Sequence, residues 1–131
     1  MGVVEEAIEH AEREVKSPIQ MAKREACDKA FLAVIYAVDE YLVERGYPKP
    51  ERHGERFAYL HDLELKSPKL KEIGLSDRVG ARFGLSHEAC FYDGHVELAE
   101  DEIDKSKKLI KLIRSLPKWP KQLSLGLKRI L

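Results

Sequence analysis

Apolar residues recur at helical spacing along most of the chain, and Gly and Pro divide this pattern into segments. Residues 3–16 carry an apolar stripe opposite a charged face, which predicts an amphipathic helix. Residues 17–20, "SPIQ", have the order of a capping box, so we predict that a second helix begins there. It is predicted to run to Arg45 and to end at Gly46, and at 1.5 Å per residue it would be about 40 Å long.

The middle of this second helix differs from an ordinary amphipathic helix. Residues 30–38, "AFLAVIYAV", are apolar on nearly every side. A helix of this kind is covered on more than one face, either by its own chain or by another subunit. We therefore predict that this segment forms the centre of a helical bundle.

The second half of the chain predicts four further helical segments. Each has an apolar stripe and a recognisable end: residues 51–66, a short helix after the second "KSP" that stops at Gly74, a helix capped by Ser76 and Asp77 that runs to Asp93 and Gly94, and residues 96–116. The predicted fold is all-α, an antiparallel up-and-down helical bundle of four to five helices, two of them long. Residues 1–116 would form a single domain, and residues 117–131 a C-terminal tail that docks on the bundle or on a partner.

Composition supports this fold and narrows the function. Only 8% of residues are aromatic, and Thr and Asn are absent, which removes many of the usual strand and hairpin-turn residues. The 23 basic and 23 acidic side chains cancel, so nucleic-acid binding would need a local basic patch. The exposed lysines of residues 105–111 are one candidate, and a solvated helix face is the other interpretation. No apolar run approaches the roughly 20 residues of a membrane span, so no membrane association is expected.

The two cysteines, Cys27 and Cys90, lie far apart and have no metal-binding or paired spacing. The N-terminal residues are too acidic for a signal peptide. We therefore expect a protein of the reducing cytoplasm with two free thiols. Cys90 beside Phe91 is interpreted as a small buried hydrophobic residue rather than a nucleophile.

Residues 80–95, "GARFGLSHEACFYDGH", concentrate the residues that can carry chemistry. Arg82 and His87 have the spacing Arg-x4-His, which suits phosphodiester cleavage without a metal. The imidazole can move a proton near neutral pH, and the guanidinium can hold the phosphate. The spacing occurs a second time at Arg56 and His61, in an amphipathic segment where we expect surface charges or a capping histidine.

Two other interpretations of residues 80–95 are open. Gly80 and Gly84 are four residues apart and would let another helix approach closely, so the segment can be a packing helix. Its other acidic and imidazole side chains give no recognised zinc spacing, and neighbouring residues on a helix point about 100° apart. The side chains that could act as ligands are His87, Glu88, Asp93 and His95, and we predict no metal and no cofactor.

The order of these features resembles the HEPN domains, small helical bundles common in archaea and bacteria, over about residues 5–116. The similarity runs through a charged first helix and then the stretch "AKREACDKAFLAVIYAVDEYLVERGYPKPERHGERFAYLHDLE", which resembles the family's long alanine-rich helix and the turn and short helix after it. It continues in "LSHEACFYDGHVELAEDEIDKSKKLIKLI", which resembles the archaeal PaREP-type branch with its "H-x-x-F-Y-E/D-G" segment, matched here by His87 and residues 91–94. The family's Arg-x4-6-His motif falls late in the chain, at Arg82 and His87.

The resemblance implies a homodimer in which Arg82 and His87 of both chains line one cleft. Active relatives cleave RNA without a metal, often as toxins neutralised by a nucleotidyltransferase-type antitoxin, and other relatives bind RNA or nucleotides without catalysis. On this basis Arg82 and His87 are the expected catalytic pair of a metal-independent endoribonuclease. Arg78 and Tyr92 are the expected RNA- or phosphate-binding neighbours.

A noncatalytic protein-interaction module is the alternative function. The residue after the motif arginine is usually polar in the family and is Phe83 here. The balanced charge and the apolar "LSLGL" of the C-terminal tail also favour a dimer whose surface or tail engages a partner protein.

Overall fold

Helix α2 (Gln20–Glu44) is the centre of the fold in the computed structural model, which describes residues 2–117. Helices α1 (Val3–Glu14) and α6 (Ala99–Ser115) and the π-helix η1 (Phe83–Tyr92) all pack against it. Within residues 30–38, every side chain except Leu32 and Tyr36 is buried. The prediction that this segment is covered on more than one face is confirmed, and the covering elements belong to the same chain.

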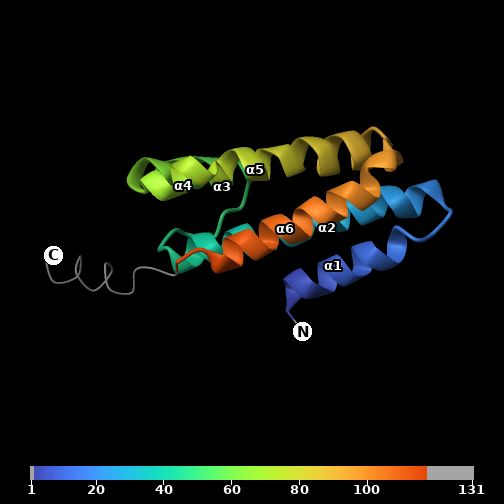
Figure 1. Ribbon diagram of the computed structural model, residues 1–131, viewed down its shortest axis with the longest axis horizontal. Helices are drawn as coiled ribbons and strands as arrows, with labels where there is room; N and C mark the ends of the chain where they lie inside the picture. The colour runs from blue at the N-terminus through green and yellow to red at the C-terminus, as the bar shows by residue number, and fades with distance from the viewer. Residues whose placement is uncertain (1, 118–131) are drawn as a thin grey trace, which may run out of the picture.

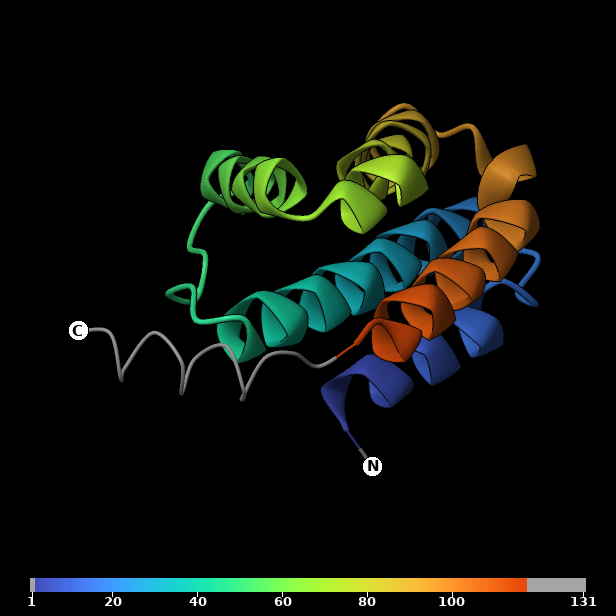
Figure 2. The ribbon, with the colours of Figure 1, turned by 60° about the vertical axis from the view of Figure 1, so that its left-hand side comes forward.

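The helices form two layers (Figures 1 and 2). Helices α1, α2 and α6 lie together in one layer. The other contains α3 (His53–Lys66), α4 (Pro68–Ile73) and a continuous rod made of α5 (Leu75–Arg82) followed by η1. The short 3₁₀ segment η2 (Val96–Leu98) turns the chain from this rod into α6. The long elements α1, α2, the α5–η1 rod and α6 alternate in direction along the chain (Figure 1).

The predicted helix ends agree with the structure at the glycines but not at every cap. Gly74 ends α4 with φ +70°, a left-handed conformation that residues other than glycine disfavour. The capping box predicted at residues 17–20 is wrong. Ser17 Oγ accepts a hydrogen bond from the Ile19 backbone (3.1 Å), and the helix begins only at Gln20. Ser76 and Asp77 also do not cap α5, because α5 begins directly after Gly74.

The rod that contains the candidate motif is not a regular α-helix. From Phe83 to Tyr92 the backbone hydrogen bonds join residues five positions apart. For example, the Asp93 N–H donates to the Glu88 carbonyl at 2.9 Å. Such i→i+5 segments are uncommon and are often found at functional sites. In this wider helix Ser86 contacts α6, whereas His87 and Cys90 contact α2. Periodicity predicted an α-helix here, because apolar spacing does not separate the two helix types.

The all-helical fold class is confirmed for residues 2–117, which contain no strand. This part of the chain has six α-helices, one in each of the six predicted helical segments and more than the four to five predicted for the bundle. None of the helices in the same range has both the length and the apolar character to span a bilayer. The predicted C-terminal tail falls almost entirely in residues 118–131, which lie outside the described residues.

Candidate functional site

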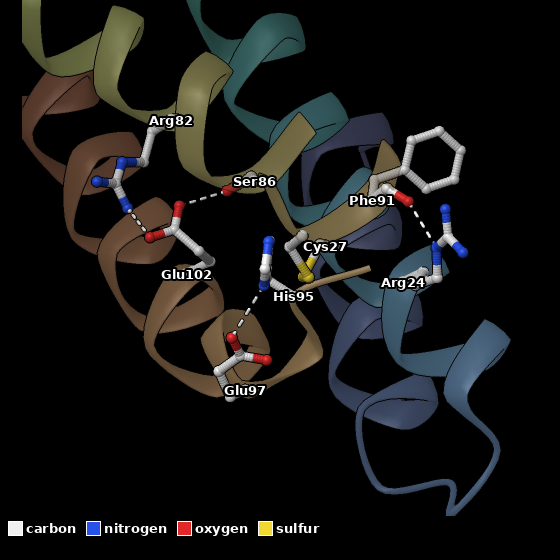
Figure 3. Close-up of a disulfide and its surroundings, with 9 residues drawn as sticks. Arg24, Cys27, Arg82, Ser86, Phe91, His95, Glu97 and Glu102 are labelled. Carbon is white, nitrogen blue, oxygen red and sulfur yellow. Dashed lines mark hydrogen bonds and ion pairs between the residues drawn. A yellow bond between two sulfur atoms is a disulfide. The ribbon is translucent and has the colours of Figure 1, made fainter. Parts of the chain in front are cut away.

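Arg82, at the end of α5, is bound by a buried carboxylate of α6 (Figure 3). Its Nη1 donates to Oε2 of Glu102 at 2.7 Å, and Ser86 Oγ donates to Oε1 of the same carboxylate at 2.5 Å. Arg82 is 6% exposed and Glu102 only 1%. Charge-assisted bonds of this kind are strong when both partners are excluded from water.

This pair decides what Arg82 can do within one chain. Its guanidinium charge is neutralised and faces α6, whereas His87 faces α2. Arg82 is almost fully buried and its charge is already balanced by Glu102, so within one chain it offers little surface to a phosphate. A single chain therefore does not bring Arg82 and His87 together around one phosphate. The structure instead gives Arg82 a role in fixing the rod to α6.

His87 is held by a carboxylate of α2. Its Nδ1 lies 3.2 Å from Oδ1 of Asp28, and its side chain is 20% exposed. An ionised carboxylate can only accept, so the hydrogen of the neutral imidazole lies on Nδ1 and Nε2 keeps its lone pair. A histidine oriented in this way can act as a hydrogen-bond acceptor or general base through Nε2.

Aromatic rings surround this histidine. Phe31 of α2 stacks on it with a centroid distance of 5.1 Å, and Tyr92 meets it edge-on at 4.9 Å. Tyr92 itself is 61% exposed. Phe83, where the family pattern has a polar residue, packs its ring against both Phe31 (5.7 Å) and His87 (5.4 Å). Phe83 therefore packs as an apolar ring between the rod and α2.

A second imidazole, which sequence reasoning missed, lies beside His87. His53 is the first residue of α3, and its ring centroid is 6.0 Å from that of His87. Arg56 Nη1 lies 2.9 Å from His53 Nδ1. Burial lowers the pKa of His53, and the charges of Arg56 and His87 lower it further. The spacing of His53 and Arg56, three residues apart on one helix, was a local signal, but nothing in the sequence placed them near His87.

Arg56, expected to be a surface charge, is buried at 5% exposure, so that expectation is wrong. Its Nε and Nη2 donate to the two oxygens of Asp39 on α2 at 2.6 and 2.8 Å. This bidentate pair ties α3 to α2 and carries His53 with it. His61, its partner in the second Arg-x4-His match, is exposed, as expected.

The two expected RNA-binding residues lie at opposite parts of the rod. Tyr92 is the last residue of η1 and contacts His87, so it shares the candidate site. Arg78 lies in the first half of α5, exposed, with its Nε donating to the Ile73 carbonyl at 2.9 Å. Arg78 therefore contacts the end of α4 rather than the histidines.

Cys27 and Cys90 form a disulfide between α2 and η1, so the expectation of two free thiols is wrong. Both residues are fully buried. Arg24, one turn before Cys27, donates its Nε to the Phe91 carbonyl at 2.6 Å (Figure 3). Since Asp28 follows Cys27 and His87 lies three residues before Cys90, these links fix the two backbones that carry the Asp28–His87 pair.

The possible metal ligands and the glycine pair of residues 80–95 lie as follows in the structure. His95 pairs with Glu97 (3.2 Å) and His87 with Asp28, so the residues considered as metal ligands are not gathered at one point. Over residues 2–117 no group of three His, Cys, Asp or Glu side chains could hold a metal. A Cβ at Gly80 would lie 3.9 Å from the Phe57 ring, whereas Gly84 faces open space. Only Gly80 is therefore in contact with another helix of the chain.

Comparisons of the chain with protein-family models, with curated proteins and with solved structures found no match. The resemblance to HEPN domains therefore depends on the residues quoted above. Any functional conclusion has to be built from the geometry of the site.

Acidification is expected to destabilise the protein partly through His53. Its pKa is lower in the folded state than the unfolded value of about 6.5, so the unfolded chain binds the proton more readily. The stability that depends on neutral His53 is present above pH 6.5 and is lost as the pH falls through the folded pKa. Urea unfolding at pH 7.5 and 5.0 should show a smaller loss in His53→Gln than in the wild type. Equal losses in both proteins would contradict this assignment.

Proposed function

We propose that this chain is a HEPN-like homodimer that binds RNA or a nucleotide at the surface around His87 and Tyr92. The observation that carries the proposal is the Asp28–His87 hydrogen bond, which orients a partly exposed imidazole beside an exposed aromatic ring. Exposed aromatic rings stack on the bases of single-stranded nucleic acid. An imidazole with a free Nε2 can accept the proton of a ribose hydroxyl.

In this proposal His87 is the proton acceptor of any metal-free cleavage, and Asp28 positions it. Arg82 keeps the α5–η1 rod against α6 through Glu102, rather than holding the phosphate within its own chain. Tyr92 contributes a stacking surface. In the proposed dimer a second copy covers the outer face of the rod, where Gly84 is open.

The test is RNA binding and cleavage by His87→Ala, with His61→Ala as the matched control. His61 is an exposed histidine of α3, so its replacement removes an imidazole without touching the site. We expect His87→Ala to lower cleavage by about 100-fold or more, the effect of removing a general base, and to weaken binding. Asp28→Asn should lower cleavage with little effect on folding. If RNA binding and cleavage survive His87→Ala undiminished in a folded protein, the proposal is wrong.

A noncatalytic protein-interaction module is the second candidate function. The buried Arg82–Glu102 pair favours it, because the motif arginine is already neutralised. Charge favours it too: four of the 23 basic residues and no acidic ones lie in 118–131, which leaves 19 basic and 23 acidic residues in 1–117. A domain with excess negative charge repels the phosphate backbone. Absence of RNA binding by the wild type, together with a stable dimer in sedimentation analysis, would favour this function.

A further inference from the structure

The hydrogen-bonding states of His53 and His87 are fixed by their partners, and they are opposite. Asp28 can only accept, so His87 carries its hydrogen on Nδ1 and offers a lone pair at Nε2. Arg56 can only donate, so Nδ1 of neutral His53 is the acceptor and its hydrogen lies on Nε2. The two partly exposed imidazoles therefore present one acceptor and one donor.

Contacts with neighbouring residues keep both imidazoles in these orientations. Asp39 binds Arg56 through two of its nitrogens, which leaves Nη1 directed at His53. The disulfide and the Arg24 contact hold the backbones on either side of the Asp28–His87 pair. Phe31 and Phe83 contact both imidazoles, with centroid distances between 5.0 and 5.7 Å. Neither ring can therefore turn without disturbing packed neighbours.

We infer that His53 and His87 together form a two-point site for a hydroxyl group next to an anionic oxygen, the pattern of a ribose 2′-hydroxyl beside its 3′-phosphate. His87 Nε2 accepts from the hydroxyl, and His53 Nε2–H donates to a phosphate oxygen. The ring centroids are 6.0 Å apart and both side chains are partly exposed, so one ligand at this surface can contact both imidazoles. This inference rests on the proposed function. It gives His87 the contact that distinguishes ribose from deoxyribose ligands and His53 the contact to the phosphate.

The probes are adenosine 3′-monophosphate and its 2′-deoxy counterpart, neither of which has a cleavable diester. Titrations followed by NMR of the full chain should show tighter binding of the ribonucleotide by about five-fold, the effect of one hydrogen bond. In His87→Ala this preference should disappear, because the deoxynucleotide loses nothing. In His53→Ala both nucleotides should weaken about equally, and His53→Gln, which keeps an N–H donor, should recover part of the loss.

Nitrogen chemical shifts of the two imidazoles at pH 8 provide a second readout that needs no ligand. We expect the hydrogen on Nε2 in His53 and on Nδ1 in His87. The same tautomer in both rings overturns the inference, and so does equal binding of the two nucleotides or failure of the ribonucleotide to bind. The proposed function is decided separately, by the RNA assay on His87→Ala, so RNA cleavage that depends on His87 without any effect of His53 would reject this inference alone.

Discussion

Replacing Glu102 with alanine is expected to lower the free energy of unfolding by about 3–5 kcal/mol, because it leaves the Arg82 guanidinium buried without a counter-charge. Ser86 Oγ loses its acceptor in the same variant. Urea unfolding followed by circular dichroism measures the change. The matched control is Glu100→Ala, an exposed residue in the same first turn of α6, for which a change within about 1 kcal/mol is expected.

A double replacement separates the loss of the pair from the loss of packing. Arg82→Met with Glu102→Met removes both charges and keeps side chains of similar length, so most of the stability should return. The same double variant tests the role given to Arg82. If the double variant still binds RNA, Arg82 acts only by holding the rod. If it is fully stable but no longer binds RNA, Arg82 contacts the phosphate. A cost for Glu102→Ala no larger than that for Glu100→Ala would contradict the buried pair itself.

The helical framework of this chain could be predicted from local signals. The apolar stripes of residues 3–16 and 96–116 and the all-apolar segment at 30–38 determine which faces are buried, and those faces are buried in the structure. Gly46, Gly74 and Gly94 all have positive φ at predicted helix ends. Such signals depend on neighbours within a few residues, which is why they can be recognised without the fold.

The candidate site could be predicted only in part, because its geometry depends on contacts between distant segments. The motif identified His87 and Tyr92, but Asp28 lies 59 residues from His87 and no spacing rule connects them. Arg56 belongs to an amphipathic segment, and its burial depends on Asp39 of α2, which lies opposite it only in the folded chain. The π-helix could not be foreseen either, because its apolar positions fit an α-helix equally well.

The same reasoning explains the error at the cysteines. Cys27 and Cys90 are separated by 63 residues, and their pairing depends on η1 lying against α2. Sequence spacing indicates a disulfide framework in short secreted chains with several cysteines, and two isolated cysteines give no such pattern.

Reduction of the Cys27–Cys90 disulfide is expected to lower the free energy of unfolding by about 4 kcal/mol. A cross-link that closes a loop of this length restricts the unfolded chain by roughly that amount. Urea unfolding of the wild type with and without dithiothreitol measures the effect after long equilibration, because both sulfurs are fully buried in the folded protein. The double variant Cys27→Ala with Cys90→Ala is the control, since its unfolding curve should not respond to the reductant.

The bond also has a functional consequence, because it holds the backbones beside Asp28 and His87. In reducing solution we expect the Asp28–His87 hydrogen bond to open more often, so RNA binding should weaken in the wild type and stay constant in the double alanine variant. Mass spectrometry after alkylation under denaturing, non-reducing conditions tests the bond directly. Two alkylated thiols in the untreated protein would show that the disulfide is absent. An unfolding midpoint unaffected by dithiothreitol would show that the bond contributes nothing to stability.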